Sequence, residues 1–395
     1  MVRRQSAEDL FSFSRCWPPG IIVVSLLLLL LLLLLSLSAK DPIRIMTTLQ
    51  VQSIPKLYTL EEINKAISKP SFEPELIDAI EKGFVKLERG DFFACPIQTM
   101  GLPPFPFVQN LEGYAAQTCV KSGYFKGQDY YVIKVASGGH PMENSGLMQV
   151  YSQKTGKMEA LLLDDGVLTE IRTAAVGALA AKLLAPKNIR AIGIVGTGIQ
   201  ARYQLQMLPN VTDCRTIWVW GRNPSKAQAF KEEIERTTTA IGGGWQVSIA
   251  KSADLLLQEC DLIITTTCAR EALLGTTTSL GSSSIRERGL HITCIGADAP
   301  GKMELDPTLI AKADLLVADT VQQTVERGEF QGVVRDGIVE KSAIVSLGSL
   351  ITQVGLHRKE EDDPRLTIFD SSGVALQDCV VSQMTYDTLR QQEQQ

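Results

Sequence analysis

The stretch Ala191–Ala201, AIGIVGTGIQA, decides the fold of this chain. It begins with largely apolar residues, which predict a buried strand, and a helix is expected directly after its glycines. Gly196 permits a tight turn, and Gly198 has no Cβ, so the backbone can approach a pyrophosphate. Ala201 is small enough for the helix to pack on the strand, and the N-terminus of the helix offers N–H groups to an anion. The stretch therefore predicts a dinucleotide-binding turn.

The segments around this turn alternate between strand-like and helix-like patterns. The helix after the turn is expected from about Ile199 to Leu208, and another over Pro224–Glu235. Such alternation predicts a doubly wound parallel sheet, a Rossmann domain that we expect to cover residues 171–365. The predicted strands after the turn are Thr216–Trp220, Val247–Ala250, Leu262–Thr267, His291–Ala297 and Leu315–Ala318.

The end of the second strand predicts which cofactor is preferred. An acidic residue there would bind the ribose 2′-hydroxyl of NAD, but the chain has Gly221 followed by Arg222. The glycine leaves room for a 2′-phosphate, and the guanidinium can pair with it. The alternative is that Arg222 is only a solvated turn residue. We expect NAD(P) as cofactor, with NADP(H) somewhat preferred.

The composition excludes several classes of function. A net charge of −5 over 395 residues, with no basic run beyond Arg3-Arg4, gives no electrostatic signal for nucleic acid. The eight cysteines form no CxxC pair, and the three histidines show no i, i+4 pairing, so we predict no metal site. The pattern is that of a reduced enzyme, not of a disulfide-stabilised domain.

The N-terminal residues 1–45 form a separate hydrophobic segment. Residues 21–39 carry no charge and include an unbroken leucine run from Leu26 to Leu35. Such a segment is typical of a signal peptide or an anchor, and it is the only part for which we expect membrane contact. Alternatively, Met46 is the working start, and the enzyme is then cytoplasmic. The sequence thus leaves two alternatives for the compartment: signal-directed or membrane-anchored, or cytoplasmic.

The region 46–170 predicts a second, α+β domain. Thr59 and Glu62 form a capping box for a short helix, and Pro74 is expected to open the next helix. Three strand-like runs follow, at Tyr130–Ala136, Gly146–Ser152 and Met158–Asp164.

Three charged residues lie inside a predicted apolar element or directly next to one. Lys134 lies inside an apolar strand, where an unpaired amine would cost several kcal/mol, so it should meet an acid or a substrate carboxylate. Arg172 precedes an expected helix over Thr173–Leu184, and its guanidinium suits a carboxylate. Asp298 follows a strand, at the sheet edge where α/β proteins bind ligands. Each has an ordinary structural explanation, but together they suit an amino-acid substrate.

These residues lie in motifs that resemble the ornithine cyclodeaminase and mu-crystallin family, from about Tyr58 to Leu389. The resemblance implies a homodimer in which the region 46–170, completed by residues 366–395, binds substrate and dimerises, while the Rossmann domain binds the cofactor. The motifs are LTEIRTAA (168–175), AKLLAP (181–186), GTGIQA (196–201), GADAPGKMEL (296–305) and FDSSG (369–373).

The resemblance also implies roles for individual residues. Lys134 and Arg172 match residues that contact the substrate carboxylate or the cofactor, and Asp298 matches the proton donor and acceptor. Further matches imply contacts to the dinucleotide from Ile199, Gln200, Thr267, Lys302 and Ser371.

The chain departs from the family pattern in two places. Cyclodeaminases carry an arginine near the segment that here reads Cys95–Gln98, so one carboxylate contact is missing or supplied otherwise. Gly221 replaces the ribose-binding aspartate of the ornithine enzymes, as in NADPH-dependent ketimine reductases. Asp298, however, matches the deaminating and dehydrogenating members and is lacking in mu-crystallin.

The resemblance predicts an ammonia-lyase that converts L-ornithine to L-proline and ammonia by recycling hydride on a bound nicotinamide cofactor. The alternative is an NAD(P)H-dependent ketimine (imino-acid) reductase or an amino-acid dehydrogenase. Ornithine, lysine, alanine and cyclic imines all stay open as substrates. A binding protein without turnover is disfavoured by Asp298, since a binder has no need of the acid.

Overall fold

The computed structural model describes residues 54–101, 117–138, 145–239, 244–276, 288–353, 355–357 and 363–394. The residues from Pro55 onward form one compact unit. The predicted N-terminal segment 1–45 and Met46 lie outside the described residues. Within the described ranges, no helix is long and apolar enough to span a bilayer.

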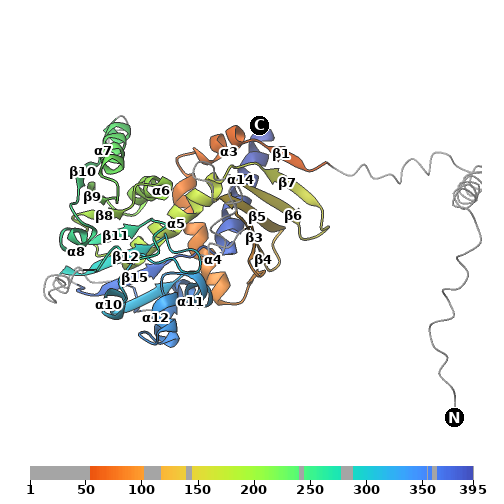
Figure 1. Cartoon of the computed structure of the whole chain (residues 1–395). Coiled ribbons are helices and arrows are strands. Elements are labelled where there is room, and N and C mark those ends of the chain that lie inside the picture. The colour runs from red at the N-terminus through yellow and green to blue at the C-terminus, as the bar shows by residue number, and fades with distance from the viewer. Residues whose placement is uncertain are drawn as a thin grey trace, which may run out of the picture. The chain divides into compact units, whose positions relative to one another are not determined.

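The second half of the chain forms a sheet in which every strand pair is parallel (Figure 1). Its strand order is β10-β9-β8-β11-β12-β15-β13-β14. After β8 the chain adds β9 and β10 on one side of this strand and then β11 and the later strands on the other side. The strand order therefore reverses between β8 and β11, beside the glycine turn. This confirms the predicted Rossmann-like sheet. The strands are β8 (Ile192–Val195), β9 (Thr216–Trp220), β10 (Gln246–Ile249), β11 (Leu262–Thr265), β12 (Leu290–Cys294), β13 (Leu315–Ala318), β14 (Ile344–Ser346) and β15 (Leu366–Asp370).

The strand β15 comes from near the end of the chain and pairs with both β12 and β13. All five of its residues are buried. The sequence motif at 369–373 pointed to this region but not to a strand. Residues 366–370 therefore belong to the second sheet, whereas the sequence analysis grouped 366–395 with the first domain.

The first half forms a mixed sheet in the order β1-β7-β6-β5-β4-β2, with β3 also paired to β4. Only β1 and β7 run parallel; the other pairs are antiparallel. Three of these strands were predicted, and β4 was not. The strands are β1 (Lys56–Tyr58), β2 (Phe92–Ala94), β3 (Gln98–Gly101), β4 (Gln117–Phe125), β5 (Tyr130–Gly138), β6 (Ser145–Ser152) and β7 (Met158–Leu162).

Helices α3 (Leu60–Ile67), α4 (Phe72–Glu88) and α14 (Ala375–Glu393) pack beside this mixed sheet (Figure 1). The capping box at Thr59 is formed as predicted, with both of its hydrogen bonds. Helix α4 begins two residues before Pro74, because a proline fits anywhere in the first turn, where backbone N–H groups have no partner within the helix.

Helix α5 (Val167–Leu184) is buried along most of its length and links the two halves. It contacts α4 and α14 on one side and α6 and β12 on the other. It begins earlier than predicted, since Asp164 accepts a hydrogen bond from the Leu168 N–H at 3.0 Å and starts the helix. Arg172 is thus inside the helix and not ahead of it.

The remaining helices lie around the parallel sheet (Figure 1). They are α6 (Ile199–Met207), α7 (Pro224–Thr239), α8 (Leu256–Glu259), α10 (Pro307–Ala311), α11 (Val321–Arg327), α12 (Gln331–Arg335) and α13 (Leu347–Thr352). The division of the chain into domains at 46–170 and 171–365 stays a prediction.

Candidate functional site

The glycine turn after β8 has the shape that a dinucleotide requires. Gly196 has a φ of +117°, and a Cβ there would lie 2.7 Å from Thr266 Oγ1. At Gly198, the N-cap of α6, a Cβ would meet nothing within 4 Å. Next to it, the apolar Ile199 is 49% exposed. An open helix N-terminus beside an uncovered apolar side chain fits a bound pyrophosphate and its adjoining nucleotide.

Other predicted cofactor residues take different positions. Ala201 is fully buried, where it allows α6 to pack closely on the sheet. Gln200 is bound to the carboxylate and carbonyl of Glu170, which ties α6 to α5. Arg222 is exposed just beyond β9, and Ser371 is buried directly after β15.

A buried carboxylate holds the loops that follow β11 and β12. Glu304 accepts hydrogen bonds from the Thr267 N–H at 2.6 Å, from the Gly296 N–H at 2.9 Å and from Thr265 Oγ1 at 2.6 Å. Burial raises the pKa of Glu304. Glu304 thus fixes the backbone on which Thr267 stands. The sequence analysis missed this role, although Glu304 lies in the 296–305 motif.

Asp298 stands beyond the end of β12 and is paired with Lys302. Its Oδ1 lies 2.6 Å from Lys302 Nζ, and the side chain of Asp298 is 56% exposed. Desolvation is the largest single influence and raises the pKa of Asp298, but the charge and hydrogen bond of Lys302 together with the charges of Lys121 and Arg327 outweigh it, so the pKa is lowered. Asp298 is therefore ionised at neutral pH and can accept a proton.

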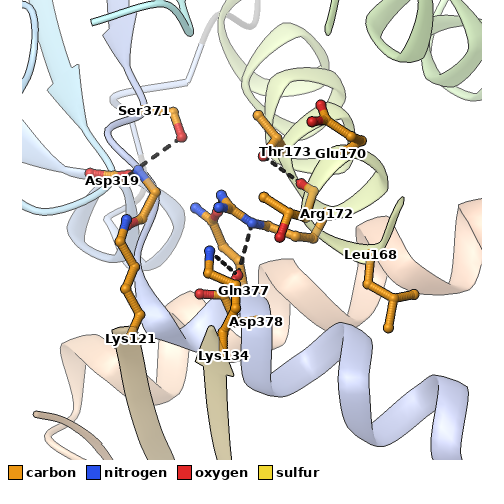
Figure 2. A network of polar contacts seen from close by, with 12 residues as sticks. Lys121, Lys134, Leu168, Glu170, Arg172, Thr173, Asp319, Ser371, Gln377 and Asp378 are labelled. Carbon is orange, nitrogen blue, oxygen red and sulfur yellow. Dashed lines mark hydrogen bonds and ion pairs between the residues drawn. The ribbon is translucent and has the colours of Figure 1, made fainter. Parts of the chain in front are cut away.

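Lys134 and Arg172 meet at one buried carboxylate (Figure 2). Lys134 Nζ from β5 and Arg172 Nε from α5 both lie 3.0 Å from Asp378 Oδ1 on α14. Arg172 also donates to Gln377 Oε1 at 2.5 Å. Burial opposes ionisation of Asp378, but the charges of Lys134 and Arg172 outweigh it and lower its pKa. The acid expected beside Lys134 is thus Asp378, which the sequence analysis did not single out.

A second lysine, Lys121 on β4, reaches the same place from beside Lys134 (Figure 2). Its Nζ donates to the Gly373 carbonyl at 2.6 Å and to the Ser372 carbonyl at 3.3 Å. Burial lowers the pKa of Lys121 to about 7, and the charges of Lys134 and Arg172 contribute.

The loop that receives Lys121 is itself fixed by a buried acid. Asp319 Oδ2 accepts from the Gly373 N–H at 2.7 Å and from Ser371 Oγ at 3.4 Å. Ser371 also donates its N–H to the Cys294 carbonyl at 3.0 Å, across from β15 to β12. Ser371, a predicted cofactor residue, therefore connects the loop that receives Lys121 with strand β12 of the parallel sheet.

The structure thus brings Lys134 and Arg172 together and places Asp298 apart from them, without direct contact. Lys121 was not found from the sequence because β4 has a weak strand pattern, and Asp378 was not found because it meets Lys134 and Arg172 only through the fold. The one available signal was that Lys121 and Asp378 are each a single charged residue in a run of otherwise apolar, small or uncharged residues. No group of three or more His, Cys, Asp or Glu residues within the described ranges could hold a metal ion.

Similarity to known proteins covers most of the chain. The family model for the ornithine cyclodeaminase/mu-crystallin family matches residues 62–393. The "Uncharacterized cyclodeaminase y4tK" of Sinorhizobium fredii is 34% identical over 275 residues, which is 68% of this chain and 78% of the relative. A Delta(1)-pyrroline-2-carboxylate reductase of Bacillus cereus is 30% identical over 250 residues, 63% of this chain and 72% of the relative.

The fold is shared with a solved enzyme structure. An archaeal alanine dehydrogenase dimer with bound NAD superimposes with a TM-score of 0.72 at 26% identity, covering 86% of this chain and 97% of that chain. The parallel sheet, the mixed sheet and the glycine turn are thus those of a known enzyme fold, and the chain belongs to the ornithine cyclodeaminase/mu-crystallin family.

Proposed function

We propose that the protein is an NAD(P)-dependent oxidoreductase that interconverts a 2-imino acid and the corresponding 2-amino acid. One observation carries the proposal: Lys121, Lys134 and Arg172 converge in a buried cluster, in which Asp378 is bound by Lys134 and Arg172 while Lys121 donates to backbone carbonyls. A buried cluster of cationic groups suits the carboxylate that every such substrate has. It would repel the second ammonium group of ornithine.

The reaction needs a hydride and a proton on opposite ends of a C=N bond. When bound at the glycine turn, the nicotinamide cofactor supplies or accepts the hydride at C2. Arg172 and Lys134 hold the substrate carboxylate and so orient C2, an effect that can lower the barrier by several kcal/mol. Asp298 passes a proton to the substrate nitrogen in reduction and takes it back in oxidation. Imino acid, reduced cofactor and one proton thus give amino acid and oxidised cofactor.

Ornithine cyclodeamination is the second candidate, and one observation favours it. Burial chiefly raises the pKa of Glu170, and the charge of Asp298 adds to it, so the charges of these two carboxylates act on each other. A second ammonium group could lie between them. In that reaction the hydride returns to the cyclic imine, and L-proline and ammonia are released with no net redox change.

One assay separates the two candidates. The protein is incubated with amino acids and with cyclic or ammonia-derived imines, and ammonia and the absorbance at 340 nm are followed together. A reductase consumes NAD(P)H stoichiometrically with the imine, whereas a cyclodeaminase releases ammonia from ornithine with no lasting absorbance change. Asp298→Asn should lose about 10²–10⁴-fold of either activity, as expected for a proton-transferring group. Ammonia from ornithine at constant absorbance would contradict the reductase proposal.

We further propose that NADP(H) binds more tightly than NAD(H), because Gly221 and Arg222 stand where an acid would bind the ribose. Arg222 is exposed and free to meet a 2′-phosphate. Arg222→Ala should weaken NADPH binding by at least tenfold and NADH binding little, since only NADPH carries that phosphate. Dissociation constants from fluorescence titration test this, and equal losses for both cofactors would remove the assignment.

We also propose a homodimer formed through the outer face of the mixed sheet. On β4 and β5 the buried side chains face α14, and several of the alternate positions are apolar and only half-buried. They include Tyr124, Tyr131, Ile133 and Val135, and the rings of Tyr124 and Tyr131 are 5.1 Å apart. An exposed apolar sheet face of this kind is typical of a protein–protein interface. The alanine dehydrogenase with the same fold is a dimer.

A further inference from the structure

Arg202 binds two carbonyl groups of the glycine turn. It is the fourth residue of α6, and its Nη1 donates to the Thr197 carbonyl at 2.8 Å and to the Gly198 carbonyl at 2.9 Å. The N–H groups at the start of a helix point away from these carbonyl groups and have no partner within the helix. With both oxygens bound to Arg202, these N–H groups are left to meet an anion.

The guanidinium of Arg202 is itself held from its other edge. Its Nε donates to Glu233 Oε1 at 2.8 Å and its Nη2 to Glu233 Oε2 at 2.5 Å, a bidentate pair with α7. Its central carbon lies 5.0 Å from the centre of the ring of Phe230, which is fully buried. The hydrogen bonds from Arg202 lower the pKa of Glu233, so the pair is ionised at neutral pH.

The glycine turn needs such support because its backbone is permissive. Gly196 and Gly198 lack the Cβ that restricts other residues, so the peptide groups between them can rotate. The Gly196 N–H donates to the Trp220 carbonyl at 2.8 Å, which fixes the start of the turn on β9. The next two peptide groups are held at their oxygens by Arg202. If either rotated, its carbonyl oxygen would face the pyrophosphate and repel it.

The same side chain connects two parts of the cofactor site. Helix α7 begins at Pro224, two residues after Arg222, where the ribose of the cofactor is expected. Through Glu233, Arg202 therefore ties the glycine turn to the helix that follows Arg222. Its four hydrogen bonds use both edges of a planar fork, which a lysine does not possess.

We propose that Arg202, supported by Glu233, is a positioning residue for the dinucleotide: it keeps the glycine turn of the ligand-free protein in the form that binds a pyrophosphate. Arg202 acts through the backbone and not on the cofactor itself. The inference rests on the proposed function only in taking the glycine turn as the cofactor site. It therefore applies equally to NADH and NADPH, which share the pyrophosphate.

Cofactor titration of Arg202→Met tests this. The Kd values for NADH and NADPH should rise by the same factor, about tenfold or more, because apparent affinity falls with the fraction of protein in the binding form. The kcat at saturating cofactor should stay unchanged. Arg202→Lys should bind as weakly as Arg202→Met, since one ammonium group cannot replace the fork. Wild-type affinity in Arg202→Lys would show that charge alone suffices and would overturn the proposal.

The pair between Arg190 and Asp261 supplies a matched control. Arg190 Nε lies 3.0 Å from Asp261 Oδ2, and Arg190 Nη2 lies 2.8 Å from Asp261 Oδ1, again a bidentate pair. It precedes β8 and β11, at the end of the parallel sheet opposite to the glycine turn. Arg190→Met should lower the melting temperature and leave both Kd values unchanged. An equal rise of Kd in Arg190→Met and Arg202→Met would mean general destabilisation and would overturn the proposal.

Hydrogen exchange reports on the turn without any turnover. In the ligand-free protein, the amides of residues 196–201 should exchange faster in Arg202→Met and in Glu233→Ala than in the wild type, and ADP-ribose should restore their protection. Glu233→Ala should also raise both Kd values, and it carries the test if Arg202→Met fails to fold, because Glu233 is partly exposed.

Two outcomes separate this inference from the proposed reaction. A wild-type protein that binds ADP-ribose through a turn that depends on Arg202, yet turns over no imino or amino acid, would refute the reaction and keep the role of Arg202. Turnover by the wild type with unchanged exchange and unchanged Kd values in the variants would refute the role of Arg202 and keep the reaction.

Discussion

Gly373 is the residue around which the cationic cluster is arranged. Its φ of +80° favours glycine, and a Cβ would press on Arg172 Nη1 at 3.0 Å and on Lys121 Nζ at 3.3 Å. Gly373→Ala should therefore displace both side chains and also add backbone strain, with a loss of about 1–3 kcal/mol in stability and a raised KM.

Gly337 supplies the matched control for this prediction. Its φ is +69°, but a Cβ there would meet nothing within 4 Å. Gly337→Ala should show the backbone cost alone, about 1 kcal/mol, with an unchanged KM. Urea denaturation and steady-state kinetics on both variants separate the backbone strain from the steric contact of the new Cβ with Arg172 and Lys121. An equal KM for the two variants would contradict the role of Gly373 in positioning these side chains.

The pKa of Lys121 predicts how ligand binding depends on pH. Burial first, and then the charges of Lys134 and Arg172, lower this pKa from 10.5 to about 7 in the ligand-free protein. Only the ammonium form attracts a carboxylate, so the affinity for a carboxylate ligand such as propionate should fall as pH rises through about 7, approaching tenfold per pH unit.

Calorimetric titration with propionate from about pH 6.5 to about pH 9 provides the measurement. Lys121→Arg should bind with little pH dependence, because a guanidinium stays charged throughout. If the decline remained in that variant, Lys134 or another group would be the one that titrates.

At the residue scale, the sequence predicted the groups that stand out against their surroundings. Lys134 in an apolar strand and Asp298 at a strand end are of this kind. Lys121 and Asp378 were missed because their importance is a matter of proximity: β4, β5, α5 and α14 bring them together over a separation of more than 200 residues. No local pattern contains that information.

At the scale of elements, the contact between α13 and α4 depends on a glycine. A Cβ on Gly348 would lie 2.6 Å from the Phe84 carbonyl oxygen and 2.9 Å from Glu88 Cβ. Gly348→Ala must push the helices apart, and we expect a loss of about 1–3 kcal/mol in the free energy of unfolding.

Gly332 in α12 is the matched helix position, since a Cβ there would meet only Arg335 Nη2, at 4.0 Å. Gly332→Ala should leave stability unchanged or raise it by up to about 1 kcal/mol, because alanine favours the helix. Denaturation midpoints of the two variants give the comparison. A stable Gly348→Ala protein would show that the helices can separate at little cost.

The elements that the sequence predicted well are those whose own residues show a clear hydrophobic pattern. The strand Leu315–Ala318 and the helix after the glycine turn are examples. The strands β4 and β15 were not predicted. The first mixes polar, small and aromatic residues without a clear alternation. The second is five buried residues that could equally belong to a helix. Their assignment depends on the partner strands.

At the scale of the whole molecule, the outer face of the mixed sheet decides the oligomeric state. Ile133→Glu places a charge in the middle of this apolar face and should convert the proposed dimer to a monomer. Ile338→Glu is the control, because Ile338 is 48% exposed and lies after α12, away from the mixed sheet. Light scattering coupled to size-exclusion chromatography reports both masses. A dimeric Ile133→Glu protein would place the interface elsewhere.

The late position of β15 and α14 sets the order in which the molecule can be completed. Until Leu366–Asp370 have left the ribosome, β12 and β13 each lack a neighbour, and until Ala375–Glu393 follow, the buried face of the mixed sheet lacks the helix that covers it. Neither core can close during most of synthesis, so the nascent chain carries two open strand edges and must be shielded from aggregation. A premature stop near the end of the message therefore yields an insoluble polypeptide, not a shortened enzyme.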